Sequence, residues 1–158
     1  MAPLDPHGPL PSHVIAELDD DGAAMLFARR GEGGLVLFTS RGRMWARAVD
    51  KSGAPVSAPP KGAPGEDAGP ATDVAPGLAA LKATADGYLA VWGEIVAQNR
   101  ALKLLSLDAA GHPRGPAVLV TQIGDAVRSV DVLPNDKGAL VLWEIAREDR
   151  AEVNVIPI

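Results

Sequence analysis

The stretch Leu107–Trp143 reads LDAAGHPRGPAVLVTQIGDAVRSVDVLPNDKGALVLW and contains every feature on which the fold prediction depends. It begins with an Asp-x-x-Gly turn, which leads into a Pro-flanked strand expected over Ala117–Gln122. After a loop comes a second strand, expected over Val127–Leu133, and then a Gly-bearing turn and an apolar strand that ends at Trp143. Gly, Asn and Asp suit such turns because they adopt positive φ at low cost.

Two further parts of the chain are imperfect copies of this stretch. Apolar runs that start with Gly close at Phe38, Trp92 and Trp143, which are 54 and 51 residues apart. The Asp-x-x-Gly turn recurs at Asp50–Gly53 and Asp108–Gly111, each time with a Pro nearby. A self-similar period of this length predicts a propeller or another repeat array.

Each unit is expected to contain four strands. The apolar run Ala139–Trp143 does not alternate, as a strand with one wet face would, so we expect it to be covered on both faces. Stacked four-stranded blades provide that environment. The further strands are expected at residues 23–28, 35–39, 44–49, 78–83, 88–92, 102–107 and 152–156. The chain is therefore interpreted as one domain, residues 1–158, with blades at about 12–55, 56–117 and 118–158.

Composition limits the classes of function. Charged residues make up 22% of the 158 residues and the net charge is −5, which argues against a surface that neutralises nucleic-acid phosphates. There is no cysteine, which excludes disulfides, thiolate metal sites and a cysteine nucleophile. No apolar run reaches the length of a membrane span, and Met1–Leu18 does not look like a signal peptide. The compartment stays open between cytoplasm and, for a trimmed chain, the cell surface or exterior.

The segment Val56–Ala75 is the irregular part of the repeat. It is rich in Pro and Gly and makes the second copy about a dozen residues longer than the others. We expect an inserted surface loop without regular structure over residues 59–72. The alternative is a binding loop or lid.

The N-terminal residues also match the repeat. Leu4–Gly8 resembles the Asp-x-x-Gly turn and is expected to lead into a strand over Ser12–Glu17. The chain ends with the third strand of a unit, so this N-terminal strand is expected to complete the blade that begins at Val127. Such closure would protect a sheet edge that otherwise invites aggregation.

Two segments carry a resemblance to a known family. GYLAVWGE with LKLLSLDAAGHP, and GALVLWEI with AEVNVIPI, resemble a repeat of long bacterial β-propeller proteins, notably from myxobacteria. The resemblance covers nearly the whole chain, and it departs from the pattern at Phe38, in place of Trp, and in the insert after Val56. It implies an all-β propeller architecture and leaves the ligand open.

Three blades cannot close a ring, because propellers need about four to eight. We expect a homodimer whose two chains together form six blades, or otherwise a larger ring or a longer native protein. The alternative fold is a β-trefoil, which also has three four-stranded repeats in a chain of this length. The consecutive meanders with tight turns favour the propeller.

The loops that follow Phe38, Trp92 and Trp143 are the candidate binding sites, because they join equivalent strands and should emerge on one rim. Arg and Asn side chains there suit carboxylates or sugar hydroxyls. The alternative is a solvated rim with internal ion pairs. Trp45 has no clear copy in the other units and is a candidate ligand-contacting aromatic, whereas Trp92 and Trp143 read as core anchors. The candidate rim residues are Arg43, Trp45, Asn99, Arg100, Arg147 and Arg150.

No pattern points to catalysis. The three histidines, His7, His13 and His112, lack metal-ligand spacing, and the Asp19–Gly22 run is only a fragment of a calcium loop. We expect no catalytic residues, metal or cofactor. The predicted function is a non-catalytic binding or scaffolding module that takes a glycan or another protein. The alternatives are a carbohydrate-binding lectin, and a hydrolase or lyase with a channel carboxylate site.

Overall fold

The structure is a computed structural model that describes residues 12–18, 25–71, 74–96, 99–121, 126–136 and 138–158. Within those residues the regular structure consists of strands, without helices, and so we find no helix long and apolar enough to span a bilayer. The strands are β1 (Met25–Arg30), β2 (Gly33–Ser40), β3 (Arg43–Val49), β4 (Glu66–Pro70), β5 (Val74–Ala83), β6 (Gly87–Val96), β7 (Asn99–Asp108), β8 (Val118–Leu119), β9 (Val127–Asn135), β10 (Gly138–Ala146) and β11 (Ala151–Pro157).

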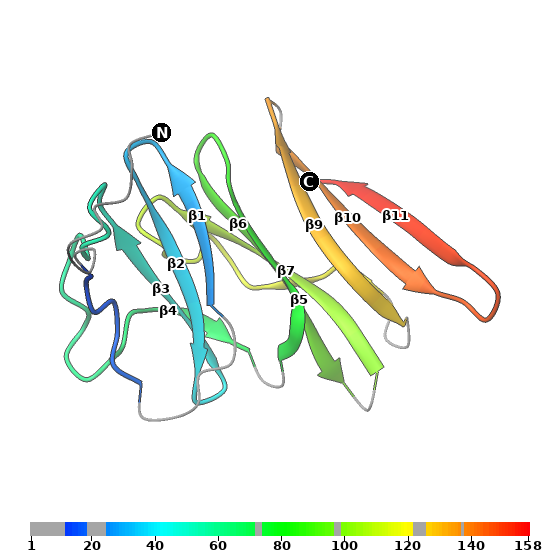
Figure 1. Cartoon of the computed structure of the whole chain (residues 1–158), viewed down its shortest axis with the longest axis horizontal. Coiled ribbons are helices and arrows are strands. Elements are labelled where there is room, and N and C mark those ends of the chain that lie inside the picture. Colours follow the sequence, from blue (N-terminus) through cyan, green and yellow to red (C-terminus); the bar gives the residue numbers. More distant parts are fainter. Residues whose placement is uncertain (1–11, 19–24, 72–73, 97–98, 122–125, 137) are drawn as a thin grey trace, which may run out of the picture.

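The strands form three antiparallel sheets that follow one another along the chain. The first sheet has the order β1-β2-β3-β4, the second β5-β6-β7-β8, and the third β9-β10-β11. Each sheet is a meander, in which sequence neighbours pair. Figure 1 shows the second sheet between the other two. All-β architecture and consecutive meanders are therefore confirmed. The described sheets are open, so the closed barrel on which a β-trefoil is built has no counterpart here.

The sheets pack face to face in chain order. Their first strands lie nearest one another, since β1 contacts β5 and β5 contacts β9. In the second and third sheets, we call the face turned towards the preceding sheet the leading face and the opposite face the trailing face. In the first sheet, the face turned towards the second sheet is the trailing face and the opposite face is the leading face. The trailing face of the first sheet, with Leu35 and Leu37, packs against the leading face of the second, with Ala90 and Trp92. The same relation joins the second and third sheets.

The central strand β6 is buried on both faces. Tyr88, Ala90 and Trp92 belong to the core between the first and second sheets. Leu89 and Val91, which point to the other face, belong to the core between the second and third sheets. Burial on both sides explains a strand that is apolar at successive positions.

The prediction of cover on both faces is wrong for Ala139–Trp143 in β10. Ala139 and Val141 are buried on the leading face, whereas Leu140 and Leu142 on the trailing face are only half-buried.

The Asp-x-x-Gly motif forms the predicted turn in both described copies. Asp50 Oδ1 accepts hydrogen bonds from the amides of Ser52 (2.8 Å) and Ala54 (3.1 Å). Asp108 Oδ1 does the same for the amides of Ala110 (2.8 Å) and His112 (2.9 Å). The fourth residue of each turn is a Gly with positive φ, 85° in the first turn and 96° in the second. The motif therefore specifies a turn, with a side chain that satisfies its backbone amides.

A second repeated glycine opens each central strand. A Cβ at Gly33 would lie 2.3 Å from the carbonyl oxygen of Val49, and one at Gly87 would lie 2.1 Å from that of Leu107. At Gly138 the same atom would lie 2.1 Å from the carbonyl oxygen of Ile158. The repeat keeps Gly at this position because the neighbouring strand approaches it too closely for any side chain.

The expected N-terminal strand is wrong. The described residues 12–18 form no strand and do not join the third sheet. Instead Ile15 and Ala16 pack on the leading face of the first sheet, against Val36 and Phe38. The segment lies here because its apolar side chains cover a face that would otherwise be exposed to water. It does not pair with β11. The predicted turn at Leu4–Gly8 lies outside the described residues.

The expectation of an insert without regular structure is wrong in part. Residues 59–64 form turns and loops, but β4 (Glu66–Pro70) is a strand that pairs with β3. Its residues disfavour strands, yet β3 offers a free edge and Ala68 is buried in the core. The insert therefore delays the fourth strand of the first sheet and does not replace it.

Candidate functional site

The candidate rim residues follow the central strand of each sheet. Arg43 begins β3, Asn99 and Arg100 begin β7, and Arg147 and Arg150 flank the turn between β10 and β11. The side chain of Asn99 lies outside the described part of the structure. These strand ends lie along the lower and right-hand side of Figure 1, one pair in each sheet. The positions are equivalent, but they are spread along the molecule.

Arg43, Arg147 and Arg150 are engaged within their own sheets, and Arg100 reaches from the second sheet to the third. Arg43 donates two hydrogen bonds to the Asp67 carboxylate on β4, one of them from Nε to Oδ1 at 3.1 Å. Arg100 Nη1 donates to the carbonyl oxygen of Val127 at 3.3 Å. Arg147 and Arg150 share the Glu152 carboxylate, each at 3.0 Å. The bond from Arg100 joins the second sheet to the third, since Val127 begins β9.

The carboxylates that receive these arginines are held in the charged form. The hydrogen bond from Arg43 lowers the pKa of Asp67 below its ordinary value. The hydrogen bonds from Arg150 and then Arg147 likewise lower the pKa of Glu152. The Arg43–Asp67 site is therefore a balanced ion pair at neutral pH, whereas Glu152 is shared by two arginines. An anionic ligand at either site would compete with the protein's own carboxylate.

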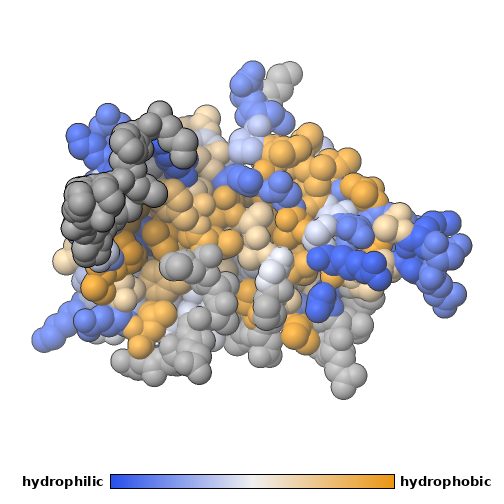
Figure 2. Space-filling model, in the orientation of Figure 1, coloured by the Kyte–Doolittle hydropathy of each residue, from blue (hydrophilic) through white to orange (hydrophobic). Residues whose placement is uncertain are grey.

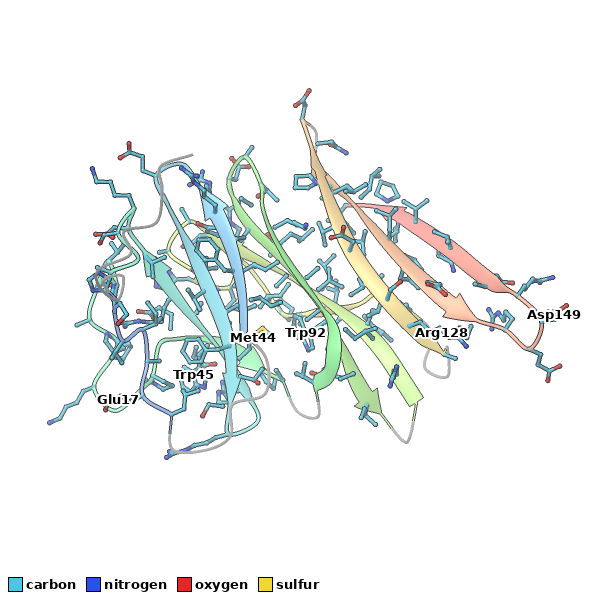
Figure 3. The ribbon with its side chains drawn as sticks, viewed as in Figure 1. Glu17, Met44, Trp45, Trp92, Arg128 and Asp149 are labelled. Atoms are coloured by element: carbon cyan, nitrogen blue, oxygen red, sulfur yellow. The ribbon has the colours of Figure 1, made fainter. Side chains whose placement is uncertain are left out.

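Trp45 lines a groove with a volume of about 650 Å³. We call it the Trp45 groove. Three segments that are distant in sequence form it: residues 14–18, the end of β2 with the turn after it, and the inserted loop. Figure 3 shows Glu17 and Trp45 at the same end of the molecule, far from Asp149 in the third sheet. Its lining residues are Val14, Ile15, Ala16, Glu17, Leu18, Ser40, Arg41, Trp45, Pro59, Gly62, Ala63 and Pro64.

The indole of Trp45 is half-buried and fixed in place. It packs beside Phe38 and Ile15 on the leading face of the first sheet. Its Nε1 donates a hydrogen bond to the carbonyl oxygen of Ser40 at 3.2 Å. Because the N–H is already used, Trp45 offers a ligand in the groove an apolar aromatic surface and no free hydrogen-bond donor.

Arg41 gives the groove a cation on a constrained turn. Its φ is 51°, and it is the one residue other than Gly with positive φ among those described. Gly42, which follows, has φ 69°, so the two form the left-handed pair typical of a tight hairpin. A bulky residue in this conformation costs energy relative to Gly or Asn.

A smaller groove of about 320 Å³ lies between the first and second sheets. Arg43, Asp67 and Lys103 line it together with prolines of the segment before β8. Lys103 Nζ lies 2.6 Å from Glu94 Oε2, and Glu94 is buried. Every charge at this groove therefore has an opposite charge beside it, which suits a structural role more than an anion site.

Sequence reasoning missed the buried Glu94. Its Oε1 accepts a hydrogen bond from Trp92 Nε1 at 3.0 Å, and its Oε2 pairs with Lys103. By register Lys103 lies directly opposite Trp92 on β6. Trp92 is buried in the core, as expected, and Glu94 supplies the hydrogen-bond acceptor that its buried N–H needs. The alternation of Trp92, Gly93 and Glu94 could have indicated that the carboxylate shares the indole's face.

The histidines do not assemble a metal site. His112 is exposed and its Nδ1 lies 3.1 Å from Asp108 Oδ2, within its own turn. His13 is exposed, and His7 lies outside the described residues, as does the Asp19–Gly22 run. Among the residues placed in the structure, no group of three or more His, Asp or Glu side chains is arranged to hold a metal ion.

Comparison with family models, with curated proteins and with solved structures gives no match to this chain. Its function has to be inferred from the residues and contacts described above.

Proposed function

We propose that this protein is a non-catalytic binding module of the β-propeller type, with its ligand in the Trp45 groove. Three consecutive meanders that stack face to face, with their first strands nearest one another, support the blade arrangement. The likeness of the sequence to bacterial propeller repeats agrees with it. Loops at the ends of propeller strands are where such scaffolds place binding residues.

The composition of the Trp45 groove carries the proposal. Three chemically different side chains line a space large enough for a small ligand: the aromatic ring of Trp45, the guanidinium of Arg41 and the carboxylate of Glu17. Arg41 reaches its position through a strained backbone conformation. Residues in such conformations are concentrated at binding and active sites, which supports a role for Arg41 in this groove.

A carbohydrate ligand is the second candidate function, favoured by Trp45. Sugar rings pack their apolar faces on aromatic side chains, while Arg and Glu side chains hydrogen-bond hydroxyl groups. In such a lectin, Trp45 would supply the contact surface and Arg41 and Glu17 the hydrogen bonds. The half-buried state of Trp45 reduces the ring area available for such a contact.

A hydrolase or lyase with carboxylates in a ring channel has less support. The first strands of the sheets would line such a channel, and β1, β5 and β9 together contain one acidic residue, Asp131. Lys82 Nζ lies 3.3 Å from the Asp131 carboxylate. Paired carboxylates for acid–base chemistry are therefore not supplied by these strands.

The groove can be tested by nuclear magnetic resonance with a panel of oligosaccharides and short peptides. We expect the Trp45 indole N–H signal and the amide signals of residues 14–18 and 61–63 to shift with one ligand class. Arg41→Ala should weaken that binding, whereas Arg114→Ala, at a distant exposed turn, should leave it unchanged. Shifts that occur elsewhere and spare this set would contradict the proposal.

A further inference from the structure

The third sheet has an exposed, largely apolar trailing face. The register identifies the equivalent residues in the other sheets. Val153 pairs with Glu144, which follows Trp143. In the second sheet, Leu102 pairs with Gly93, which follows Trp92. Met44 holds the same position beside Phe38 in the first sheet. The three side chains therefore occupy one position of the repeat, on the trailing face.

Exposure at this position differs sharply between the sheets. Leu102 is 0% exposed and Met44 is 3% exposed, because the next sheet covers each of them. Val153 is 75% exposed. Val155 repeats the contrast, since it is exposed while its counterparts Leu104 and Ala46 are buried.

These positions belong to a largely apolar face, which also holds Asp131 opposite Leu142 and Glu144 opposite Val153. Leu133 on β9 pairs with Leu140, and Leu142 pairs with Val155, so these side chains lie side by side across three strands. Figure 2 shows apolar colour over the third sheet, between hydrophilic turns. Apolar faces of this kind on a folded protein mark interaction sites. The apolar members of this face are Leu133, Leu140, Leu142, Val153, Val155 and Pro157.

The first sheet has a complementary gap on its leading face. Phe27 on β1 pairs with Val36, as Leu81 pairs with Ala90 and Val132 with Val141 in the other sheets. Leu81 is 5% exposed and Val132 is 0% exposed, because the preceding sheet covers them. Phe27 is 58% exposed. The inner part of the leading face therefore lacks the cover that its equivalents receive.

The outer part of the same face is already covered by the chain itself. Ile15 and Ala16 pack over Val36, Phe38 and Trp45, on β2 and β3. As described, the third sheet has three strands, whereas the first and second each have four. A three-stranded sheet placed on β1 and β2 would leave room at its outer edge for residues 12–18.

We propose that the trailing face of the third sheet binds the leading face of the first sheet of a second copy of this chain. The contact would repeat the packing that already joins the first sheet to the second and the second to the third. The contact would form twice in the dimer, once on each side of a two-fold axis. The three sheets of one copy and the three sheets of the other would then close a ring of six. Residues 12–18 of one copy would then lie beside β11 of the other.

A cross-link between two first strands tests this geometry directly. The repeat identifies a pair of positions on first strands that face each other across a sheet contact. On the trailing side Leu133 is equivalent to Ala28 and Lys82. On the leading side Phe27 is equivalent to Leu81. The chain has no cysteine, so Leu133→Cys and Phe27→Cys variants each carry a single thiol. With one variant mass-tagged and a short bismaleimide added, we expect the mixed product to form when both are present.

The alternatives give different products. A Leu133→Cys variant that cross-links to itself would mean that two trailing faces meet, which would overturn the proposal. No cross-linked product of either kind would also overturn it.

A second test uses charge on the exposed face. Val153 and Val155 are exposed in one chain, so Val153→Glu with Val155→Glu should leave the fold intact by circular dichroism. We expect the doubly substituted chain to sediment at half the mass of the unmodified protein. Val56→Glu, at an exposed loop residue outside both faces, should keep the unmodified mass. A double variant with unchanged mass would contradict the interface.

Discussion

Val153 and Leu102 occupy the same position in successive sheets, yet Val153 is 75% exposed and Leu102 is fully buried. The sequence keeps an apolar residue at this position in both sheets, and only the neighbour differs. A β-branched residue with no cover is poorly explained by the single chain. The third sheet therefore lacks, at this position, the cover that the second sheet receives from its neighbour.

Replacement of Arg41 by Gly should separate stability from binding. Gly adopts φ near 51° at low cost, so Arg41→Gly should raise the free energy of unfolding by about 1 kcal/mol. The same change removes the guanidinium from the Trp45 groove and should abolish ligand binding there. Urea denaturation and ligand titration measure the two effects. A variant that binds as well as the original would remove Arg41 from the site.

Replacement of Gly87 by Ala should destabilise the second sheet. The added Cβ would lie 2.1 Å from the Leu107 carbonyl oxygen, so β6 and β7 would have to separate. We expect a loss of about 2 kcal/mol in the free energy of unfolding, the usual scale for backbone overpacking. Gly115→Ala is the matched control, because nothing lies within 4 Å of its added Cβ. Equal effects of the two changes would contradict the close approach.

The ion pair of Lys103 with the buried Glu94 should matter more than the exposed pair of Lys82 with Asp131. Lys103→Met leaves a buried carboxylate with only the Trp92 hydrogen bond, and should cost about 2 kcal/mol. Lys82→Met removes a pair in which both side chains are over 40% exposed, and should cost under about 0.5 kcal/mol. Urea denaturation compares them. Adding Glu94→Leu to Lys103→Met should recover much of the loss, since no buried charge remains.

Asp67 should make stability depend on pH through Arg43. The hydrogen bond from Arg43 lowers the folded pKa of Asp67 below the value of about 3.9 that it has in the unfolded chain. This contribution is present above the unfolded pKa and is lost as pH falls through the folded pKa. Arg43→Gln should raise the pKa of Asp67 and reduce the fall in stability as the pH drops below the unfolded pKa. Carbon-detected titration of the Asp67 carboxyl checks the shift, and an unchanged pKa would contradict the role of Arg43.

Much of the fold could be predicted because its determinants are local. The Asp50 and Asp108 turns are specified by side chains within four residues, and Gly87 records the approach of a neighbouring strand. The apolar run that ends at Trp92 reports burial on both faces of its strand. Each of these features has a recognisable sequence pattern, and the recurrence of the pattern along the chain makes it easier to identify.

The remaining parts depend on distant packing. Strand β4 contains Glu, Asp, Gly and Pro, which disfavour strands, and it forms because β3 offers an edge. Residues 12–18 have no position of their own until the face with Val36 and Phe38 exists to receive them. The Trp45 groove depends on both, so Trp45 could be named from the sequence whereas the residues around it could not.

The mass of the unmodified chain in solution, measured by light scattering across a dilution series, tests the account most directly. One chain has a mass of 16.3 kDa. Two chains that cover each other's exposed faces should give twice that mass, and the dimer should persist on dilution because the contact is duplicated around the ring. A well-folded particle with the mass of one chain at every concentration would contradict the ring and leave Val153 without a partner.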